Sequence, residues 1–130
     1  MITAKEALYY ALSQDEELKT LLGKGNRVFS AWADTLSVLP CITFFVVSSN
    51  LERANIDRTT TLFQVDIWDK INSEKIDEVA MRIKELLHNQ SIRTDTELKS
   101  FLSIVGMMRE GFEGDLRRVS IDVTIHTLEV

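Results

Sequence analysis

The sequence contains few of the residues on which many functional classes depend. Its 130 residues include one cysteine, Cys41, and two histidines, His88 and His126. One cysteine forbids an intramolecular disulfide, and a lone thiol with two histidines distant in sequence makes no zinc-binding pattern. We therefore expect the chain to fold in a reducing cytoplasm, without a structural metal.

Long apolar runs and low-complexity segments are also missing. The longest apolar stretch, Cys41 to Val47, contains Thr43 and is far shorter than the roughly 20 residues that span a bilayer. The N-terminus lacks a charged leader followed by a wholly apolar block, so the sequence predicts no signal peptide. Pro40 is the only proline and no linker divides the chain, so we expect one domain over residues 1–130.

Basic residues do not outnumber acidic ones. The chain has 15 lysines and arginines against 20 aspartates and glutamates, a formal net charge of -5. Dedicated nucleic-acid-binding proteins usually carry a basic patch or stripe, so this balance argues against that class. A glycine-rich phosphate loop is missing too, because Gly23 to Arg27 follows a helical pattern and is interpreted as a helix stop.

What is present is a regular pattern of apolar residues. Thr3 with Glu6 forms a capping box before a helical stripe. Ser13 with Glu16 forms a second capping box, which suggests that the helix bends or restarts there. Asn72 is expected to cap a second helix. Alternating apolar residues predict strands. In order, the expected elements are a helix over 4–22, strands over 27–31, 41–49 and 59–69, a helix ending at residue 87, and strands over 98–108 and 116–129. The order α-β-β-β-α-β-β predicts an α+β domain, a mainly antiparallel sheet with two helices packed on one face.

Two strands carry carboxylates that could do chemistry. Asp66 and Asp122 lie on the less apolar faces of their strands, and a carboxylate pair can act in acid–base catalysis or hold a hard metal ion. The alternative, which we favour, is that both are solvent-facing or pair with Arg117 or Arg118. Cys41 follows Pro40 within an apolar strand, and no spacing joins it to a histidine, so we interpret it as a buried small hydrophobe. The sequence predicts no catalytic residue, metal site or cofactor.

Three features favour an interaction protein over an enzyme. The polar segment Ser48 to Arg58 is expected to be a long loop between two strands, and connections of that length are often functional. Glu110 to Asp115 is expected to be a turn holding an aromatic residue among three acids, and Trp68 lies on the polar face of its strand. Each feature has an alternative interpretation. The polar segment could be a surface loop without function, the aromatic residue of the turn could pack back against its own chain, and the second helix could cover Trp68. The candidate interface residues are Leu51, Arg53, Ile56, Arg58, Trp68 and Phe112.

An ordered set of segments resembles a known family. The segments are Gly25-Asn26-Arg27-Val28-Phe29, Leu39-Pro40-Cys41-Ile42, Phe63-Gln64-Val65-Asp66-Ile67-Trp68, an amphipathic helix, and the closing strand from Arg118 to His126. With the N-terminal helix they resemble the tail completion or tail terminator proteins of long-tailed bacteriophages and prophages. Members often show an aromatic residue after Leu-Pro, where this chain has Cys41.

The resemblance implies a structural virion protein that is not an enzyme and needs no cofactor. Such a protein forms a ring, typically a hexamer, at the head-proximal end of the tail tube, where it joins the tube to a head-completion protein. It assembles in the bacterial host cytoplasm and resides at the head–tail junction of the virion. DNA passes through without specific binding, and no membrane is involved.

The resemblance also suggests a use for the acidic charge. A negative channel wall repels the phosphate backbone and lets DNA slide. The candidate lumen acids are Asp66, Glu110, Glu113, Asp115 and Asp122. The main alternative is a small α+β ligand-binding or regulatory domain that uses Asp66 or Trp68 in a pocket. A hydrolase with a metal between Asp66 and Asp122 is the third hypothesis.

Overall fold

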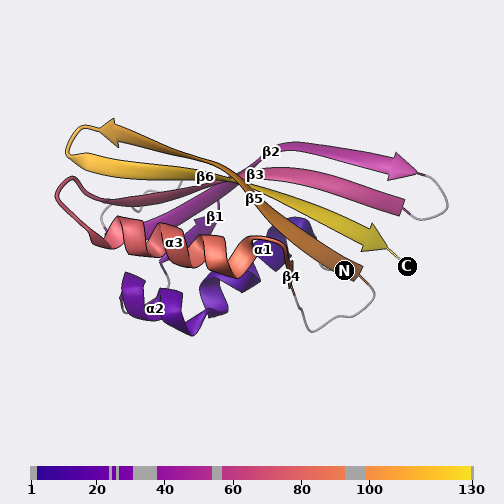
Figure 1. The fold of residues 1–130 in the computed structure, drawn as a ribbon, viewed down its shortest axis with the longest axis horizontal. Coiled ribbons are helices and arrows are strands. Elements are labelled where there is room, and N and C mark those ends of the chain that lie inside the picture. Colours follow the sequence, from indigo (N-terminus) through magenta and orange to yellow (C-terminus); the bar gives the residue numbers. More distant parts are fainter. Residues whose placement is uncertain are drawn as a thin grey trace.

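In the computed structural model, a six-stranded sheet carries helices on one side (Figure 1). The structure describes residues 3–23, 25, 27–30, 38–53, 57–92 and 99–129. Their elements are α1 (Ala4–Gln14), α2 (Glu16–Leu22), β1 (Val28–Ser30), β2 (Cys41–Arg53), β3 (Asp57–Lys70), α3 (Lys75–Leu87), β4 (Gln90–Ile92), β5 (Lys99–Glu113) and β6 (Leu116–Glu129). The α+β class and the order of elements are confirmed, with the first helical segment divided and the short β4 added.

The strands follow the order β1-β2-β3-β6-β5-β4 across the sheet. β1 pairs with β2 in parallel, and the other four pairs are antiparallel. The two outermost strands have only three residues each, whereas the four inner strands have 13 to 15. Most of the length of β2 and β5 therefore extends beyond β1 and β4, the short strands on their outer sides.

Capping explains where the helices begin. Thr3 Oγ1 accepts a hydrogen bond from the backbone N–H of Glu6 at 3.2 Å, as the first capping box predicted. The restart is at Asp15 and not Ser13, because the Asp15 carboxylate accepts from the N–H of Leu18 at 3.0 Å while its backbone is extended. The predicted cap at Asn72 is also wrong. α3 begins two residues beyond Ser73, whose hydroxyl accepts from the N–H of Lys75.

The core lies between the helices and one face of the sheet. Phe63, Val65 and Ile67 of β3 alternate toward this face and are fully buried, as the sequence predicted. The strand pairing places Phe44 beside Val65 and Val65 beside Ile121, so three strands contribute to one apolar row. The α3 stripe predicted from the sequence is buried in the same cluster: Ile76, Val79, Ala80, Ile83 and Leu87.

The prediction that β2 is covered on both faces holds only for its first half. Cys41 to Phe44 are buried, but Phe45 and every described residue after it up to Leu51 are exposed. Figure 1 shows why, since the β2–β3 hairpin continues past the end of the helical layer. Val46, which is paired with the core residue Phe63, therefore has no helix to pack against, and Phe45 points to the helix-free face.

Two predicted connections are mostly strand. Ser48 to Arg53 pairs with residues 57–62, so only residues 54–56 separate the strands, and those lie outside the described residues. A polar hairpin can extend into solvent because its two strands satisfy each other's backbone groups. The predicted turn from Glu110 to Asp115 is also shorter than expected. β5 continues to Glu113, and the turn needs only Gly114, at φ +58°, with Asp115.

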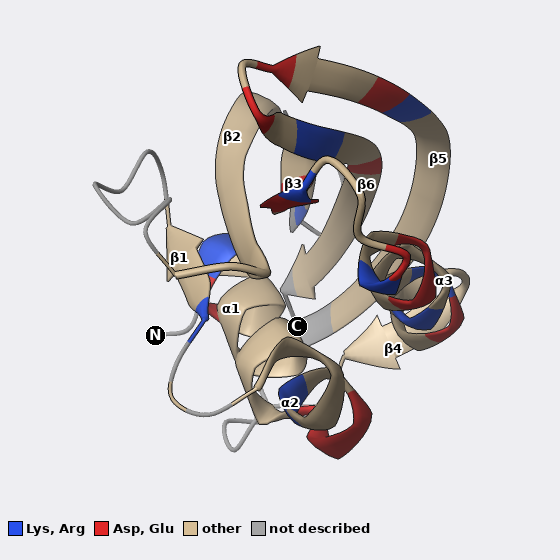
Figure 2. Ribbon diagram, turned by 90° about the vertical axis from the view of Figure 1, so that its left-hand side faces the viewer, with Lys and Arg blue, Asp and Glu red and all other residues tan. Residues whose placement is uncertain are grey.

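A β-bulge lies in each of the strands β2 and β5. Val47 is an extra residue opposite β3, and Gly106 with Met107 lies opposite the single residue Asp122 of β6. Bulges bend and twist the strand that contains them. Figure 2 shows β5 and β6 arching strongly, and this curl decides which side chains of the helix-free face are buried.

Candidate assembly interface

The structure leaves two of the predicted contact residues strongly exposed. Leu51 on β2 is 52% exposed and Phe112 on β5 is 59% exposed. Arg58 on β3 is exposed as well. Ile56 lies outside the described residues, as does the side chain of Arg53. Leu51 and Phe112 come from strands on opposite sides of the sheet centre, so they belong to two separate surfaces.

Trp68 is not a surface contact. Its side chain is 1% exposed, its Nε1–H donates to Thr43 Oγ1 at 3.0 Å, and the Arg118 guanidinium lies 5.6 Å from the ring centroid. As the alternation along β3 predicted, Trp68 points away from the helices. That face is closed here within a single chain, so the assignment of Trp68 to a subunit interface is wrong.

Asp66 is also buried, at 4% exposure, and accepts hydrogen bonds from Gln64 Nε2 at 3.0 and 3.2 Å. A buried carboxylate cannot line a channel, so its place among the lumen acids is wrong. Asp122 lies on the same face of the neighbouring strand, opposite Gln64. Arg109 holds Asp122 through two hydrogen bonds of 2.9 and 3.0 Å, in place of the expected Arg117 or Arg118.

Asp66 and Asp122 thus lie on one face of adjacent strands, but Gln64 and Arg109 already occupy their carboxylates. The hydrogen bond to Asp122 is the main cause of a raised pKa for Arg109. Within the described residues, no group of three or more His, Cys, Asp or Glu side chains could hold a metal ion. The Arg109–Asp122 ion pair links β5 to β6. The described residues therefore do not support the third hypothesis, a metal-dependent hydrolase.

The other candidate lumen acids lie at the tip of the β5–β6 hairpin. Arg117 bonds Glu110 at 2.7 Å, and Arg118 bonds Glu113 at 2.9 Å. Arg117 also reaches Asp77 in the first turn of α3 at 3.0 Å, which ties the hairpin to the helix. Asp115 is exposed at the turn. Because most of these acids lie beside an arginine, the hairpin tip contributes less net negative charge than the sequence suggested.

Sequence reasoning found Leu51 and Phe112 but missed several other exposed apolar residues. Two runs of consecutive apolar residues, on opposite sides of the sheet, remain in solvent in the single chain: Phe45, Val46 and Val47 on β2, and Met107 and Met108 on β5. One signal was available, because two consecutive methionines interrupt the alternation of β5 at its bulge. No such signal marks β2, since its apolar run is equally typical of a buried strand.

A hollow lies between α1, α2 and the start of β1. Tyr9, Leu12, Lys19 and Arg27 are among the residues that line it. Neither Asp66 nor Trp68 lines this hollow, so the residues expected to bind a ligand do not meet there.

The comparisons with known proteins identify the family. Residues 6–128 match the family described as "Tail completion protein gp17". The chain belongs to this family. It is thereby a structural component of a phage-type virion, as the sequence resemblance implied. A chain in the solved structure titled "Virion of native gene transfer agent (GTA) particle" has the same fold, with a TM-score of 0.69 and 13% identity over 96% of this chain and 94% of that one. The comparison with curated proteins found no match.

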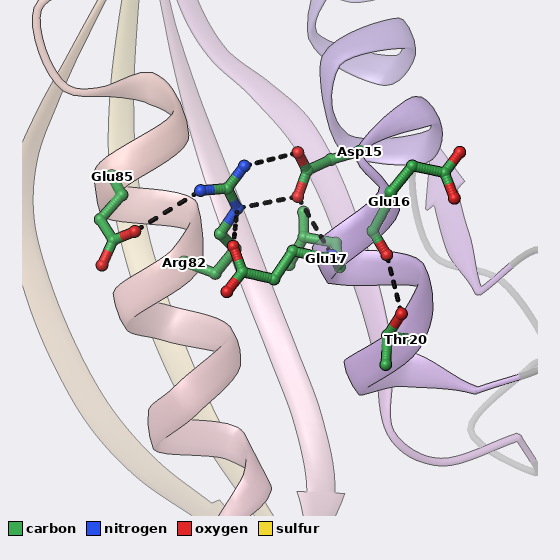
Figure 3. Close-up of polar contacts among 7 residues, drawn as sticks. Asp15, Glu16, Glu17, Thr20, Arg82 and Glu85 are labelled. Carbon is green, nitrogen blue, oxygen red and sulfur yellow. Dashed lines mark hydrogen bonds and ion pairs between the residues drawn. The ribbon is translucent and has the colours of Figure 1, made fainter.

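An ion-pair cluster fixes the helical layer of this tail completion protein. Figure 3 shows Arg82 of α3 pointing at Asp15, the cap of α2, with bonds of 2.7 and 2.9 Å, and at Glu17 and Glu85. The Arg82 hydrogen bond is the main cause of a lowered pKa for Asp15, and the bond from the Leu18 N–H adds to it. The cluster joins α2 to α3, which is its structural role.

We expect Arg82→Met to lower the free energy of unfolding by about 1–2 kcal/mol at pH 7, because it leaves the partly buried Asp15 without its partner. The folded pKa of Asp15 lies below its ordinary 3.8, so this stabilisation is present above pH 3.8 and is lost as the pH falls through the folded value. Urea unfolding at pH 7 and pH 2.5 measures it, and the gap between the two proteins should narrow at the lower pH. A gap that stays constant with pH would contradict the assignment. Glu85→Gln, at the exposed end of the cluster, should change little.

Cys41 is buried as the sequence predicted, and burial raises the pKa of its thiol to about 11. A thiolate is the reactive form, so this thiol is inert in the folded protein. We expect no modification by a thiol reagent at pH 7.5 within hours and stoichiometric modification in urea, measured by mass spectrometry. Rapid modification of the native protein would show that the segment around Pro40 opens readily.

No helix in the described part of the chain is long and apolar enough to cross a membrane.

Proposed function

We propose that this tail completion protein assembles as a ring, most simply a hexamer, at the head-proximal end of the tail tube and joins the tube to a head-completion protein. The observation that carries the proposal is the family match over residues 6–128. The fold shared with a chain of a gene transfer agent virion supports it. In this proposal the protein acts through its binding surfaces. Its partners are other copies of the same chain, the tail tube protein and the head-completion protein.

The exposed apolar residues support an assembling protein. Phe45 and Val47 on β2 and Met107 and Phe112 on β5 are each at least 40% exposed in the single chain. Apolar area left in water is favourable to bury, and contiguous exposed apolar residues commonly mark interaction sites. Assembly provides that burial without any change in the core.

A structural role requires no cofactor or catalytic residue. Cys41 is buried and protonated, while Asp66 and Asp122 are held by Gln64 and Arg109. We propose that DNA passes the ring without specific binding, as expected for a chain with a net charge of -5. Asp115, exposed at the β5–β6 turn, remains a candidate for a lumen wall, as do the ion-paired Glu110, Glu113 and Asp122.

Deletion of the gene in the phage or prophage that encodes this chain tests the joining function. We expect filled heads and separate tails with no joined particles, and a loss of infectious or transducing particles of at least a hundredfold. The gene supplied from a plasmid should restore joining. Normal numbers of joined particles in the deletion strain would contradict the proposal. The deletion strain also provides the tail tubes for the assembly experiments below.

A further inference from the structure

In the part of the chain that the structure describes, two strand edges lie open, on opposite sides of the same sheet. Among the described residues, β1 pairs only with Ile42 to Phe44, so residues 45–53 of β2 have no strand on that side. β4 pairs only with Phe101 to Ser103, and residues 106–113 of β5 likewise have none. Each open edge is eight or nine residues long, which leaves a row of backbone N–H and C=O groups without a strand partner.

Each open edge contains one of the two β-bulges, but its exposed apolar part carries no unpaired charge that would oppose pairing. Natural edge strands are commonly blunted by lysines or other charges. β2 has no charged residue from Phe45 to Leu51, and the two charges of its open edge, Glu52 and Arg53, stand at the last two positions of the strand. On β5, Arg109, Glu110 and Glu113 are each paired with a side chain of β6. The groups left at the β5 edge are the apolar Met107, which is 63% exposed, and Phe112.

We infer that the open edge of β2 in one copy pairs with the open edge of β5 in the next copy, so that the sheets of neighbouring subunits continue into one another. This inference rests on the proposed ring and names the surface that closes it. The strand directions favour it. β2, β3, β6 and β5 are successively antiparallel, so β2 and β5 run in opposite directions. A neighbour placed beside the sheet by a simple rotation therefore presents its β2 antiparallel to β5, the more stable pairing.

The size of the contact is sufficient for a specific interface. A shared edge of eight residues is roughly 27 Å long and forms about eight backbone hydrogen bonds, close to the ten or so of a standard interface. Val47 and Leu51 from one copy and Met107 and Phe112 from the next supply apolar burial beside it. Because the two surfaces differ, the contact is heterologous, and such contacts build closed rings when the rotation closes.

Two edge variants test the inference. Val47→Lys/Leu51→Lys charges the β2 edge, and Met107→Lys/Phe112→Lys charges the β5 edge. We expect each to raise the concentration needed for assembly roughly a hundredfold or more, measured by native mass spectrometry of the full chain with and without tail tubes. An equal mixture of the two should form a discrete dimer, since one intact edge of each kind remains. Tyr10→Lys/Met81→Lys, which charges exposed helical positions, should assemble like the wild type.

Each other result has a definite meaning. Edge variants that assemble normally would overturn the edge pairing and leave the ring proposal standing. Dimers formed by the β5-edge variant alone would show symmetric β2–β2 pairing and contradict a heterologous contact. A wild-type chain that stays monomeric, even with tail tubes, would overturn the ring itself.

Hydrogen exchange of the wild-type protein is a second readout that does not depend on how a variant folds. Backbone amides in 45–53 and 106–113 should gain protection on assembly, and unchanged exchange in both segments would also overturn the inference.

Discussion

Replacing Trp68 with alanine is expected to lower the free energy of unfolding by about 3–5 kcal/mol. The side chain is 1% exposed, donates to Thr43 and lies under the Arg118 guanidinium, so truncation leaves a cavity and removes a buried hydrogen bond. A domain of this size is typically stable by 5–15 kcal/mol, so much of that stability would be lost. Urea unfolding followed by far-UV circular dichroism measures it.

Two controls separate burial from assembly at this site. Trp68→Phe keeps most of the ring volume but loses the N–H donor to Thr43, and it should cost about 1–2 kcal/mol. Phe112→Ala removes a mostly exposed ring and should change stability by less than about 0.5 kcal/mol while weakening assembly. A Trp68→Ala protein as stable as the wild type but unable to assemble would contradict the structure and restore Trp68 as a contact residue.

Replacing Phe44 with alanine should have a similarly large effect, about 3–5 kcal/mol. Phe44 is fully buried, and its ring centroid lies 6.3 Å from that of Tyr9 on α1 and 6.3 Å from that of Phe63 on β3. The side chain thus joins the first helix to the sheet, and the cavity would separate them.

The neighbouring residue provides a matched control. Phe45 has the same side chain one position along the strand, but it points to the other face and is 40% exposed. Phe45→Ala should cost the monomer less than about 1 kcal/mol. Thermal unfolding of both variants at one protein concentration tests the pair. Equal losses would contradict the assignment of the two faces of β2.

The periodic parts of the fold could be predicted from the sequence because one face of each element is buried. Phe63, Val65 and Ile67 alternate, and the α3 stripe repeats every three or four residues, as burial against a single core requires. The three-residue strand β4 is too short to show any period. Its contribution to the sheet depends on pairing with β5, which is not visible locally.

The surface residues of the candidate interface were harder to predict, because the curvature of the sheet determines which side chains are buried. Trp68 and Asp66 occupy the face that alternation assigns to solvent, yet they are buried where the sheet curls. That curl accompanies bulges at Val47 and at Gly106–Met107, and a bulge depends on the partner strand as well as its own. Conversely, Phe45 and Val46 have the composition of a core strand and lie in solvent. Phe45 points to the helix-free face, and Val46 faces the helical side but lies past the end of the helical layer.

Cryo-electron microscopy of tail tubes from the deletion strain, after incubation with the purified protein, shows directly whether the protein forms a ring at the end of the tube. We expect a closed ring at one end of each tube, the end to which heads attach, with a continuous sheet between neighbouring copies. Protein bound along the tube wall or at the opposite tip, or tubes that stay bare at saturating protein, would contradict it.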